Sequence, residues 1–485
     1  MPQFPKQYEE NMKALLTEEG FCSYAATFEH EYRQGLRVNT LKISPEDFLK
    51  RRSDLSLRPV PWCPEGFYFS GETSAFSKHP DYAAGLYYLQ EPSAMAPAAI
   101  LPIEKGDVVL DLCAAPGGKS TYLAAKLGRS GVLFSNDISP SRAKALLKNL
   151  ELTGTTQAVV ISEAPYALSR RFPELFDKIL VDAPCSGEGM FHKEPAIMKN
   201  WEQYGNEYYA KLQREILESA WQMLKKGGML LYSTCTFSPM EDEQMVMSFL
   251  EAHPDMSLRP IDKVGGMEDG HPEWTDQKDE NLRMTARFWP QKLEGQGHFA
   301  ALFYKSEEGS GLSAAAAKRN AARQKAANPF GLESADQRGA FSSADLKLFE
   351  AWCGENLTAS WRKILPEGGY LSKIGTSLYY SPVPQGALKG LRVLRCGLLL
   401  GELKKDRFEP SQAFAMALKA SDVKQTLELP VASGEVQRYL KGETLTGEMK
   451  DGWNLVLTGG YPLGWGKAVR GLLKNKYLKG WIQNG

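Results

Sequence analysis

The sequence has few cysteines, no excess of either charge and no long apolar run. Its seven cysteines include no C-x-x-C pair, which argues against a disulfide framework and favours a reducing compartment. Lys plus Arg and Asp plus Glu both number 58, which excludes a polybasic chain that coats nucleic acid by charge alone. Apolar runs of about 18 residues are absent, as is a signal-peptide core after MPQFPKQYEENMK. We therefore predict a cytoplasmic protein without a membrane span.

The length of 485 residues predicts roughly three domains. Strand-like apolar runs alternate with helical patterns in the middle of the chain, which is typical of an α/β layer fold. A small, polar and basic stretch after it is interpreted as a linker. The predicted segments are an N-terminal α+β domain over 1–90, a catalytic domain over 91–305, the linker over 306–329, and a C-terminal region over 330–485 that folds on its own.

Five strands are predicted in the middle segment, and a polar or reactive residue stands at the end of each. They cover 108–112, 131–137, 158–162, 176–182 and 227–235, and helices are predicted over 120–127, from Pro140 to about Leu152, and over 207–224. Ser139 is the expected N-cap of the second helix, with Pro140 in its first position. Ligands of open α/β sheets bind at the carboxyl ends of the strands, so we expect the functional site there.

The segment CAAPGGK (113–119) joins the first of these strands to a helix. Its two glycines allow the backbone to approach a ligand closely. A phosphate-binding P-loop would need glycine where Cys113 stands, and no G-x-G-x-x-G fingerprint occurs. A Gly-rich turn alone would be an ordinary connection, but Asp137, Glu163 and Asp182 end the next three strands. Because Asp137 suits ribose hydroxyls, we predict a nucleoside cofactor without pyrophosphate, S-adenosyl-L-methionine being the main candidate.

Two cysteines follow neighbouring strands, Cys185 in DAPCSGEG and Cys235 in YSTCTFSP. Free cysteine is usually a small buried hydrophobe, which is the role expected for Cys22, Cys353 and Cys396. Two adjacent parallel strands would instead bring Cys185 and Cys235 to the same edge of the sheet. A disulfide disagrees with a reducing compartment, and no nearby residues have the spacing of metal ligands. We therefore predict two reactive thiols and no metal site.

The motifs DLCAAPGGK, VDAPCSGEGMF and YSTCTFSPMEDE resemble those of the Nop/Sun family of RNA cytosine-5 methyltransferases. The segments HPDYAAGLYYLQEPSAM (79–95) and PLGWGKAVRGLLKNKYLKG (462–480) resemble the bacterial branch of the family that methylates 16S ribosomal RNA. The resemblance covers nearly the whole chain and is strongest over 79–305. It implies a class I S-adenosylmethionine-dependent methyltransferase, with a Rossmann-like, mostly parallel seven-stranded sheet, and a PUA-like RNA-binding domain within the C-terminal region.

The resemblance also assigns roles to the motif residues. Carbon C5 of cytosine is a poor nucleophile, and a thiolate that adds to C6 makes it enamine-like. By resemblance Cys235 is this nucleophile, Cys185 helps to release the product, and Asp182 hydrogen-bonds the N3/N4 edge of the base. The implied cofactor contacts are Cys113, Ala114, Ala115, Pro116, Gly117, Gly118 and Lys119 around the methionine part, Asp137 at the ribose, Glu163 near the adenine, and Asp182.

The end of the chain, 459–485, is basic and rich in aromatic residues. It contains Lys467, Arg470, Lys474, Lys476 and Lys479, no acid, and the interleaved aromatics Tyr461, Trp465, Tyr477 and Trp481. This composition suits RNA phosphates and unpaired bases, whereas a basic amphipathic helix with a packed aromatic face is the alternative. The resemblance to a PUA-like module favours RNA. Arg37 and Asn39 match the RNA-facing N-terminal segment of the family, although a strand with exposed polar residues would look alike.

The leading hypothesis is methylation of C5 of a cytosine in 16S ribosomal RNA through a covalent Cys–C6 adduct. The base must be unstacked, because C6 cannot be reached inside a duplex. The alternatives are a transfer-RNA cytosine-5 methyltransferase, a non-catalytic RNA-binding assembly factor and a DNA cytosine-5 methyltransferase. The last class uses the Pro-Cys motif at Cys185 as its nucleophile, so Thr234-Cys235 on the next strand favours RNA. We expect a monomer with RNA, and neither DNA nor a membrane, as its partner.

Overall fold

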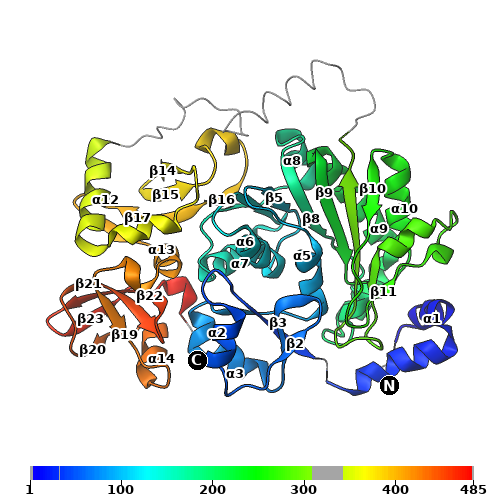
Figure 1. The fold of residues 1–485 in the computed structure, drawn as a ribbon, viewed down its shortest axis with the longest axis horizontal. Coiled ribbons are helices and arrows are strands. Elements are labelled where there is room, and N and C mark those ends of the chain that lie inside the picture. The colour runs from blue at the N-terminus through cyan, green and yellow to red at the C-terminus, as the bar shows by residue number, and fades with distance from the viewer. Residues whose placement is uncertain (1–3, 32, 308–341, 483–485) are drawn as a thin grey trace, which may run out of the picture.

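The computed structural model describes residues 4–31, 33–307 and 342–482, and this part of the chain builds four sheets (Figure 1). The predicted linker 306–329 lies outside the described residues except for its first two positions. Among the helices of the described ranges, none has the length and apolar character needed to cross a membrane.

The first sheet has the strand order β2-β3-β1-β4 and is entirely antiparallel. Its elements are α1 (Lys6–Ala26), β1 (Gln34–Val38), α2 (Pro45–Arg51), β2 (Arg58–Val60), β3 (Cys63–Phe69), α3 (Thr73–Ser77), α4 (Pro80–Ala83) and β4 (Tyr87–Leu89). Strand β1 ends at Val38, because the chain turns after it: the amides of Lys42 and Ile43 donate to the Asn39 carbonyl. Helix α1 packs elsewhere: Tyr8 and Tyr24 contact Phe191 and Phe237, which follow the two reactive cysteines.

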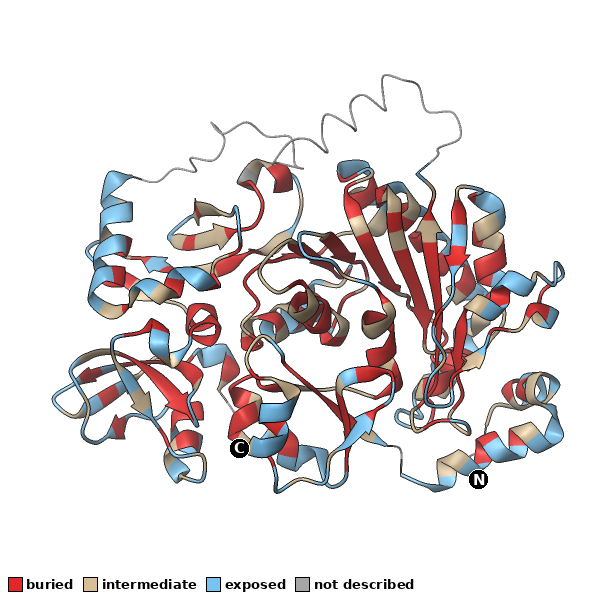
Figure 2. Cartoon of the chain, in the orientation of Figure 1, coloured by how far each residue is buried: buried red, intermediate tan, exposed pale blue. Residues whose placement is uncertain are grey.

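The second sheet carries the predicted central strands. Its elements are α5 (Ala96–Ile100), β5 (Val108–Asp111), α6 (Gly118–Leu127), β6 (Val132–Asn136), α7 (Pro140–Leu152), β7 (Ala158–Ile161), α8 (Pro165–Arg171), β8 (Phe176–Asp182), α9 (Ile197–Met223), β9 (Leu224–Thr234), α10 (Glu243–Ala252), β10 (Met256–Arg259), β11 (Glu268–Asp269), β12 (Ala286–Phe288) and β13 (His298–Lys305). Strands β7-β6-β5-β8-β9 run parallel in this order, and β13 follows antiparallel. Every residue of β5, β6 and β7 is buried (Figure 2), as expected of parallel strands covered on both faces.

Helices cover both faces of this sheet. Apolar side chains of α5, α6 and α7 pack on one face, and those of α8, α9 and α10 pack on the other. Helix α7 begins as predicted, with Ser139 as N-cap and Pro140 in the first position. Helix α9 is longer than expected and kinks at Gly205, whose φ of 67° is a conformation that glycine adopts without strain. This α/β architecture agrees with the predicted fold class.

The C-terminal region builds two further sheets and adds a strand to the central one. Its elements are α12 (Ser343–Asn356), β14 (Tyr370–Ile374), β15 (Ser377–Ser381), β16 (Val393–Cys396), β17 (Leu398–Leu403), β18 (Phe408–Pro410), α13 (Gln412–Ala417), β19 (Thr426–Glu428), α14 (Gly434–Leu440), β20 (Leu445–Thr446), β21 (Gly452–Thr458), β22 (Tyr461–Val469) and β23 (Leu472–Asn475). Strand β16 pairs antiparallel with β7. The expectation that 330–485 folds on its own is therefore wrong at β16.

The central sheet is also larger than the seven strands that the resemblance implied. It has ten strands in the described part of the chain. The additional strands stand at its two sides: β16 completes one edge, and the short strands β10, β11 and β12 flank β13 at the other. The parallel core from β7 to β9, which positions the predicted site, is unaffected by these additions.

The basic, aromatic end of the chain is not the amphipathic helix that we weighed as an alternative. It forms β22 and β23, followed by one short helical turn. Trp465, Tyr477 and Trp481 are buried in the last sheet, so these three rings are core residues and are not available to stack on RNA bases. Tyr461 is half-buried and carries the Arg51 guanidinium over its ring.

The two residues predicted to face RNA near the N-terminus are buried instead. Arg37 and Asn39 are 1% and 3% exposed. Arg37 donates to the Gly118 carbonyl (2.9 Å) and the Thr121 hydroxyl (2.8 Å) at the start of α6. Asn39 donates to the Thr153 carbonyl (2.9 Å) at the end of α7. These bonds fasten the first sheet to the central domain, and the RNA-facing assignment of both residues is wrong.

We predict that Arg37→Met lowers the free energy of unfolding by about 3 kcal/mol, because it removes buried charge-assisted hydrogen bonds and leaves their acceptors unpaired. Urea unfolding measures this change. Arg58→Met is the matched control, since Arg58 is exposed and its ion pair with Glu294 lies at the surface; it should change stability by less than about 1 kcal/mol. Equal effects of the two variants would contradict the proposed fastening.

Candidate active site

The residues predicted from the strand ends converge at one edge of the central sheet. The loop 113–119 follows β5, Asp137 follows β6, and Glu163 follows β7. Asp182 is the last residue of β8, and Cys235 comes directly after β9. Because these five strands are parallel and adjacent, all of these positions lie at the carboxyl edge, as the sequence predicted.

The loop 113–119 is held in a bent conformation by its neighbours. Gly117 has φ of 114°, a region that favours glycine, and serves as the N-cap of α6. The Ala114 amide donates to the Asn136 carbonyl (2.8 Å), and the Asn149 side chain donates to the Pro116 carbonyl (2.8 Å). Burial, together with the nearby carboxylate of Asp111, raises the pKa of the Cys113 thiol. Cys113 therefore stays a neutral thiol, and its role in the loop is structural.

The acceptor side chains at this edge fit S-adenosyl-L-methionine, which carries an ammonium group and two ribose hydroxyls as donors. The Asp111 carboxyl is fully buried beside the loop, and its Oδ1 has no hydrogen-bond partner within the described residues. Burial raises the pKa of this carboxyl to about 7. Asp137 accepts from the amides of Ala115 (3.3 Å) and Ser139 (2.9 Å), which fix its carboxylate at the end of β6, where a ribose is expected.

Glu163 lies at the predicted strand end but is engaged by the C-terminal region. Its Oε1 accepts from the backbone amide of Arg392 (2.7 Å), and the Arg392 guanidinium is 3.7 Å away. The neighbouring Ser162 amide donates to the Arg392 carbonyl. The segment before β16 thus reaches the edge of the cofactor region, which the sequence did not indicate, and the role of Glu163 at the adenine stays a prediction.

Asp182 stands at the centre of a charged network. Its Oδ2 accepts from Lys119 Nζ (2.6 Å), its Oδ1 accepts from the Ser233 hydroxyl (2.9 Å), and His298 Nε2 lies 3.4 Å from Oδ1. Burial alone would raise the pKa of this carboxyl, but the Lys119 ammonium, together with the adjacent His298 ring, outweighs it and holds the pKa well below the usual range. Asp182 is therefore an ionised acceptor, held by three elements.

The two cysteines predicted to react are in contact. Their Sγ atoms are 3.3 Å apart as free thiols, and the Cys235 amide also points at Cys185 Sγ (3.3 Å). The hydrogen bond with Cys235 and burial raise the pKa of Cys185 well above the ordinary value of a thiol. Cys185 is therefore a thiol that keeps its proton, and it lies within reach to donate that proton toward the Cys235 sulfur.

Two buried carboxylates cross between the loops that carry these cysteines. Glu241, from the Cys235 loop, accepts from the Ser186 amide (3.0 Å). Glu188, from the Cys185 loop, accepts from the Phe237 amide (2.9 Å). The Gly189 amide donates to the Cys235 carbonyl (2.9 Å). Each loop thus supplies the acceptors for the other, so the two sulfurs are held by reciprocal hydrogen bonds and not by a covalent bond.

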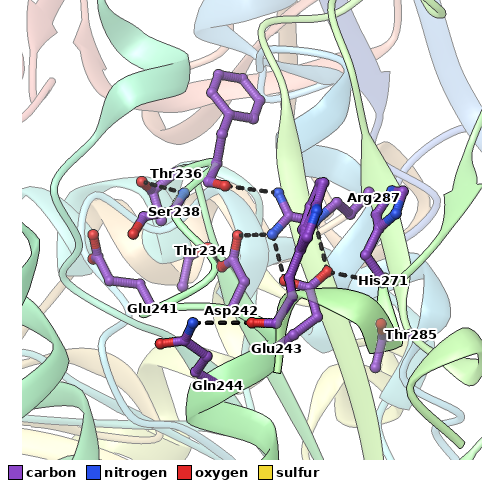
Figure 3. Close-up of polar contacts among 12 residues, drawn as sticks. Thr234, Thr236, Ser238, Glu241, Asp242, Glu243, Gln244, His271, Thr285 and Arg287 are labelled. Carbon is purple, nitrogen blue, oxygen red and sulfur yellow. Dashed lines mark hydrogen bonds and ion pairs between the residues drawn. The ribbon is translucent and has the colours of Figure 1, made fainter. Parts of the chain in front are cut away.

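Three consecutive acids close the Cys235 loop, and all are fully buried (Figure 3). Glu241 faces the Cys185 loop, whereas Asp242 accepts from the Thr234 hydroxyl (2.6 Å) and Glu243 accepts from Arg287 Nε (2.7 Å). This acidic run is part of the motif YSTCTFSPMEDE, but the sequence alone does not indicate its role. Nor does the sequence indicate Arg287 and His298, which come from β12 and β13 and have no recognisable pattern around them.

Relatives of the chain cover nearly its whole length. It is 31% identical over 497 aligned positions to the "Ribosomal RNA small subunit methyltransferase F" of Enterobacter sp. (strain 638), covering 99% of this chain and 96% of that protein. The protein of the same name from Escherichia coli (strain SE11) is 30% identical over the same shares of both chains.

The chain belongs to the RsmF family.

Family descriptions match consecutive segments of this chain. Residues 4–92 match the N-terminal domain of 16S rRNA methyltransferase RsmF, and 98–304 match 16S rRNA methyltransferase RsmB/F. Residues 351–418 match the first C-terminal domain of RsmF, and 426–483 match its PUA domain. These matches confirm the predicted family, the methyltransferase fold class and S-adenosyl-L-methionine as the cofactor.

Solved structures agree with this family. A methyltransferase homologue from Pyrococcus horikoshii, 31% identical, superposes with a TM-score of 0.55 over 62% of this chain and 95% of its own. NSun6 from the same organism, solved with SFG, superposes with a TM-score of 0.54 over 63% of this chain and 99% of its own. At 23% identity the second likeness supports the fold alone.

We predict that Glu241→Gln removes a pH dependence of stability. Burial, with Glu188 nearby, raises the pKa of the Glu241 carboxyl from 4.5 to about 7. A carboxyl with a raised folded-state pKa stabilises the fold fully below its unfolded pKa and loses that contribution as pH rises through the folded pKa. Between pH 4.5 and 8, wild type should therefore lose about 3 kcal/mol relative to the variant. Chemical unfolding at both pH values measures the difference, and parallel stability curves would contradict it.

Proposed function

We propose that this edge of the sheet methylates C5 of a cytosine in 16S ribosomal RNA, through a covalent bond between the Cys235 sulfur and C6. The observation that carries the proposal is the pair of thiols in contact beside the ionised Asp182 and Lys119. S-adenosyl-L-methionine supplies an electrophilic methyl group, which cytosine C5 can accept only after a nucleophile has added to C6.

The chain's own residues divide the remaining work. Cys235 loses its proton to water and its thiolate bonds to C6, while the low pKa of Asp182 keeps that side chain as the acceptor for the N3/N4 edge of the base. After C5 has gained the methyl group, its proton passes to water, and the electron pair of the C5–H bond restores the ring double bond as the C6–S bond breaks and releases the Cys235 thiolate. Cys185, which holds a proton 3.3 Å away, stabilises the departing thiolate and so helps release.

The protonation of Cys185 also bears on the choice of nucleophile. A DNA cytosine-5 methyltransferase would use Cys185, but the pKa of this thiol is raised by its bond to Cys235 and by burial. A thiol that keeps its proton is a poor nucleophile. This favours Cys235, and with it RNA, over the alternative chemistry.

RNA is the partner of the protein, in line with its PUA domain. The basic residues of 459–485 remain candidates for phosphate contacts: Lys467, Arg470, Lys474 and Lys479 are exposed, and Lys476 is half-buried. With Trp465, Tyr477 and Trp481 in the core, recognition in this region is proposed to rest on charge more than on stacking. A monomer that acts in the cytoplasm on ribosomal RNA or the small subunit is part of the same proposal.

We predict opposite fates for the two cysteine variants. Cys235→Ala should abolish methyl transfer and form no adduct, because the bond to C6 cannot form. Cys185→Ala should still form the adduct but release it slowly, leaving a slowly migrating RNA–protein complex. Single-turnover reactions with a labelled methyl donor, resolved on denaturing gels, measure both steps.

Cys22→Ala is the control for these variants and should behave as wild type. Cys22 lies in α1 and is exposed, so the expectation that it is buried is wrong, whereas Cys353 and Cys396 are buried as expected. An adduct that is lost in Cys185→Ala and kept in Cys235→Ala would reverse the two roles. Unchanged 5-methylcytosine in the 16S RNA of a deletion strain would overturn the proposed substrate.

A further inference from the structure

The nucleophile is tethered on both sides of its position in the chain. The residue before it, Thr234, donates its hydroxyl to Asp242 Oδ1 (2.6 Å). Two residues after it, the Phe237 carbonyl accepts from Arg287 Nη1 (2.9 Å). Asp242 Oδ2 lies 3.1 Å from Arg287 Nη2 (Figure 3). Both tethers therefore end at one guanidinium, on β12.

The guanidinium of Arg287 is itself fixed by a two-point contact. Nε donates to Glu243 Oε1 (2.7 Å), and Nη2 donates to Glu243 Oε2 (2.5 Å). This fork orients the third nitrogen, Nη1, toward the Phe237 carbonyl. Lysine could supply the charge but not this geometry, because its donors sit on a single nitrogen.

The cluster is closed to water. Arg287 is 1% exposed, and Asp242 and Glu243 are fully buried. The rings of Trp274, Trp289 and Phe299 lie 4.8–5.5 Å from the guanidinium carbon. Movement of the guanidinium would leave the buried Glu243 carboxylate without its partner, which is costly in a site closed to water.

The sheet register places Arg287 to act on the nucleophile. Strand β13 lies between β12 and β9, with Ala300 opposite Ser233 and Ala286 opposite Ala300. The Arg287 side chain thus spans from β12 to the loop after β9, and Glu243 at the start of α10 meets it there (Figure 3). No other cation within the described residues forms an ion pair with Asp242 or Glu243.

We propose that Arg287 is a positioning residue for Cys235, which sets the place of the nucleophilic sulfur through Phe237 on one side and through Asp242 and Thr234 on the other. The inference rests on the proposed function and adds a residue that does not touch the base or the cofactor. Its removal changes where the Cys235 sulfur stands relative to Cys185 and C6. A displacement of about 1 Å at a reacting atom can cost roughly a hundredfold in rate.

The test compares variants that weaken each tether and keep the packing. Arg287→Lys retains the charge but loses the two-point contact with Glu243. Thr234→Val removes the hydroxyl at similar volume, and Thr234→Ser keeps a hydroxyl at this position. Arg395→Lys is the matched control, because Arg395 is also a shielded arginine in an ion pair, with Glu151 (2.6 Å), on β16 at the opposite edge of the sheet.

Adduct formation is followed with 16S RNA transcribed with 5-fluorocytidine, in which fluorine at C5 cannot leave as a proton does, so that the adduct persists. We expect Arg287→Lys and Thr234→Val to slow its formation about ten- to hundredfold. Affinity for S-adenosyl-L-methionine should stay within about twofold, and Thr234→Ser and Arg395→Lys should match wild type. Wild-type adduct rates per folded molecule in both tether variants would overturn the proposal, as would a parallel loss of cofactor affinity.

A second measurement needs no RNA. Diamide accepts two electrons and two protons from a pair of thiols and leaves a disulfide, so its rate reports the distance between Cys185 and Cys235. We expect this disulfide to form about tenfold more slowly in Arg287→Lys than in wild type, and at the wild-type rate in Arg395→Lys. If wild type forms no RNA adduct, the proposed function fails, and the disulfide rates alone decide the positioning role: equal rates overturn it.

Discussion

The catalytic edge depends on the reciprocal hydrogen bonds between the loops that carry Cys185 and Cys235. Two sulfurs in contact without a covalent bond would drift apart unless the backbone around them were fixed. Glu241 and Glu188 provide that fixation, because each is a buried carboxylate that accepts a backbone N–H of the opposite loop. Separating the loops would take one backbone donor from each buried carboxylate, and an unsatisfied buried acceptor costs more than the hydrogen bond itself contributes.

Buried contacts from the N-terminal region also fix the elements around the site. Arg37 and Asn39 join the first sheet to α6 and α7, and α1 packs its aromatic side chains on the residues that follow the cysteines. The N-terminal region thus buttresses the cofactor loop from one side and the nucleophile loop from another. The sequence resemblance places Arg37 and Asn39 at an RNA surface, but these polar side chains instead hold the first sheet against the catalytic domain.

The sequence predicts the parallel core and the site edge well, because both are encoded locally. Buried strands appear as short apolar runs, and the polar residue that ends each run is adjacent in sequence. It does not predict the partners of those residues. Arg287 meets Glu243 across 44 positions of sequence, His298 meets Asp182 across a strand, and β16 meets β7 from the far end of the chain. The predicted RNA contacts were wrong where the side chain is buried. Arg37, Trp465 and Trp481 are polar or aromatic residues of the kind that bind RNA, but tertiary packing covers them.

Strand β16 has a consequence for how the protein can be divided. The chain leaves the catalytic sheet after β13, and the C-terminal region then returns to complete the opposite edge of that sheet beside β7. An exchange of this region for another RNA-binding module would therefore strip a strand from the enzyme's own core and expose the backbone of β7 as an unpaired edge. The first C-terminal domain and the catalytic domain are therefore joined by main-chain pairing between β16 and β7 and share one sheet.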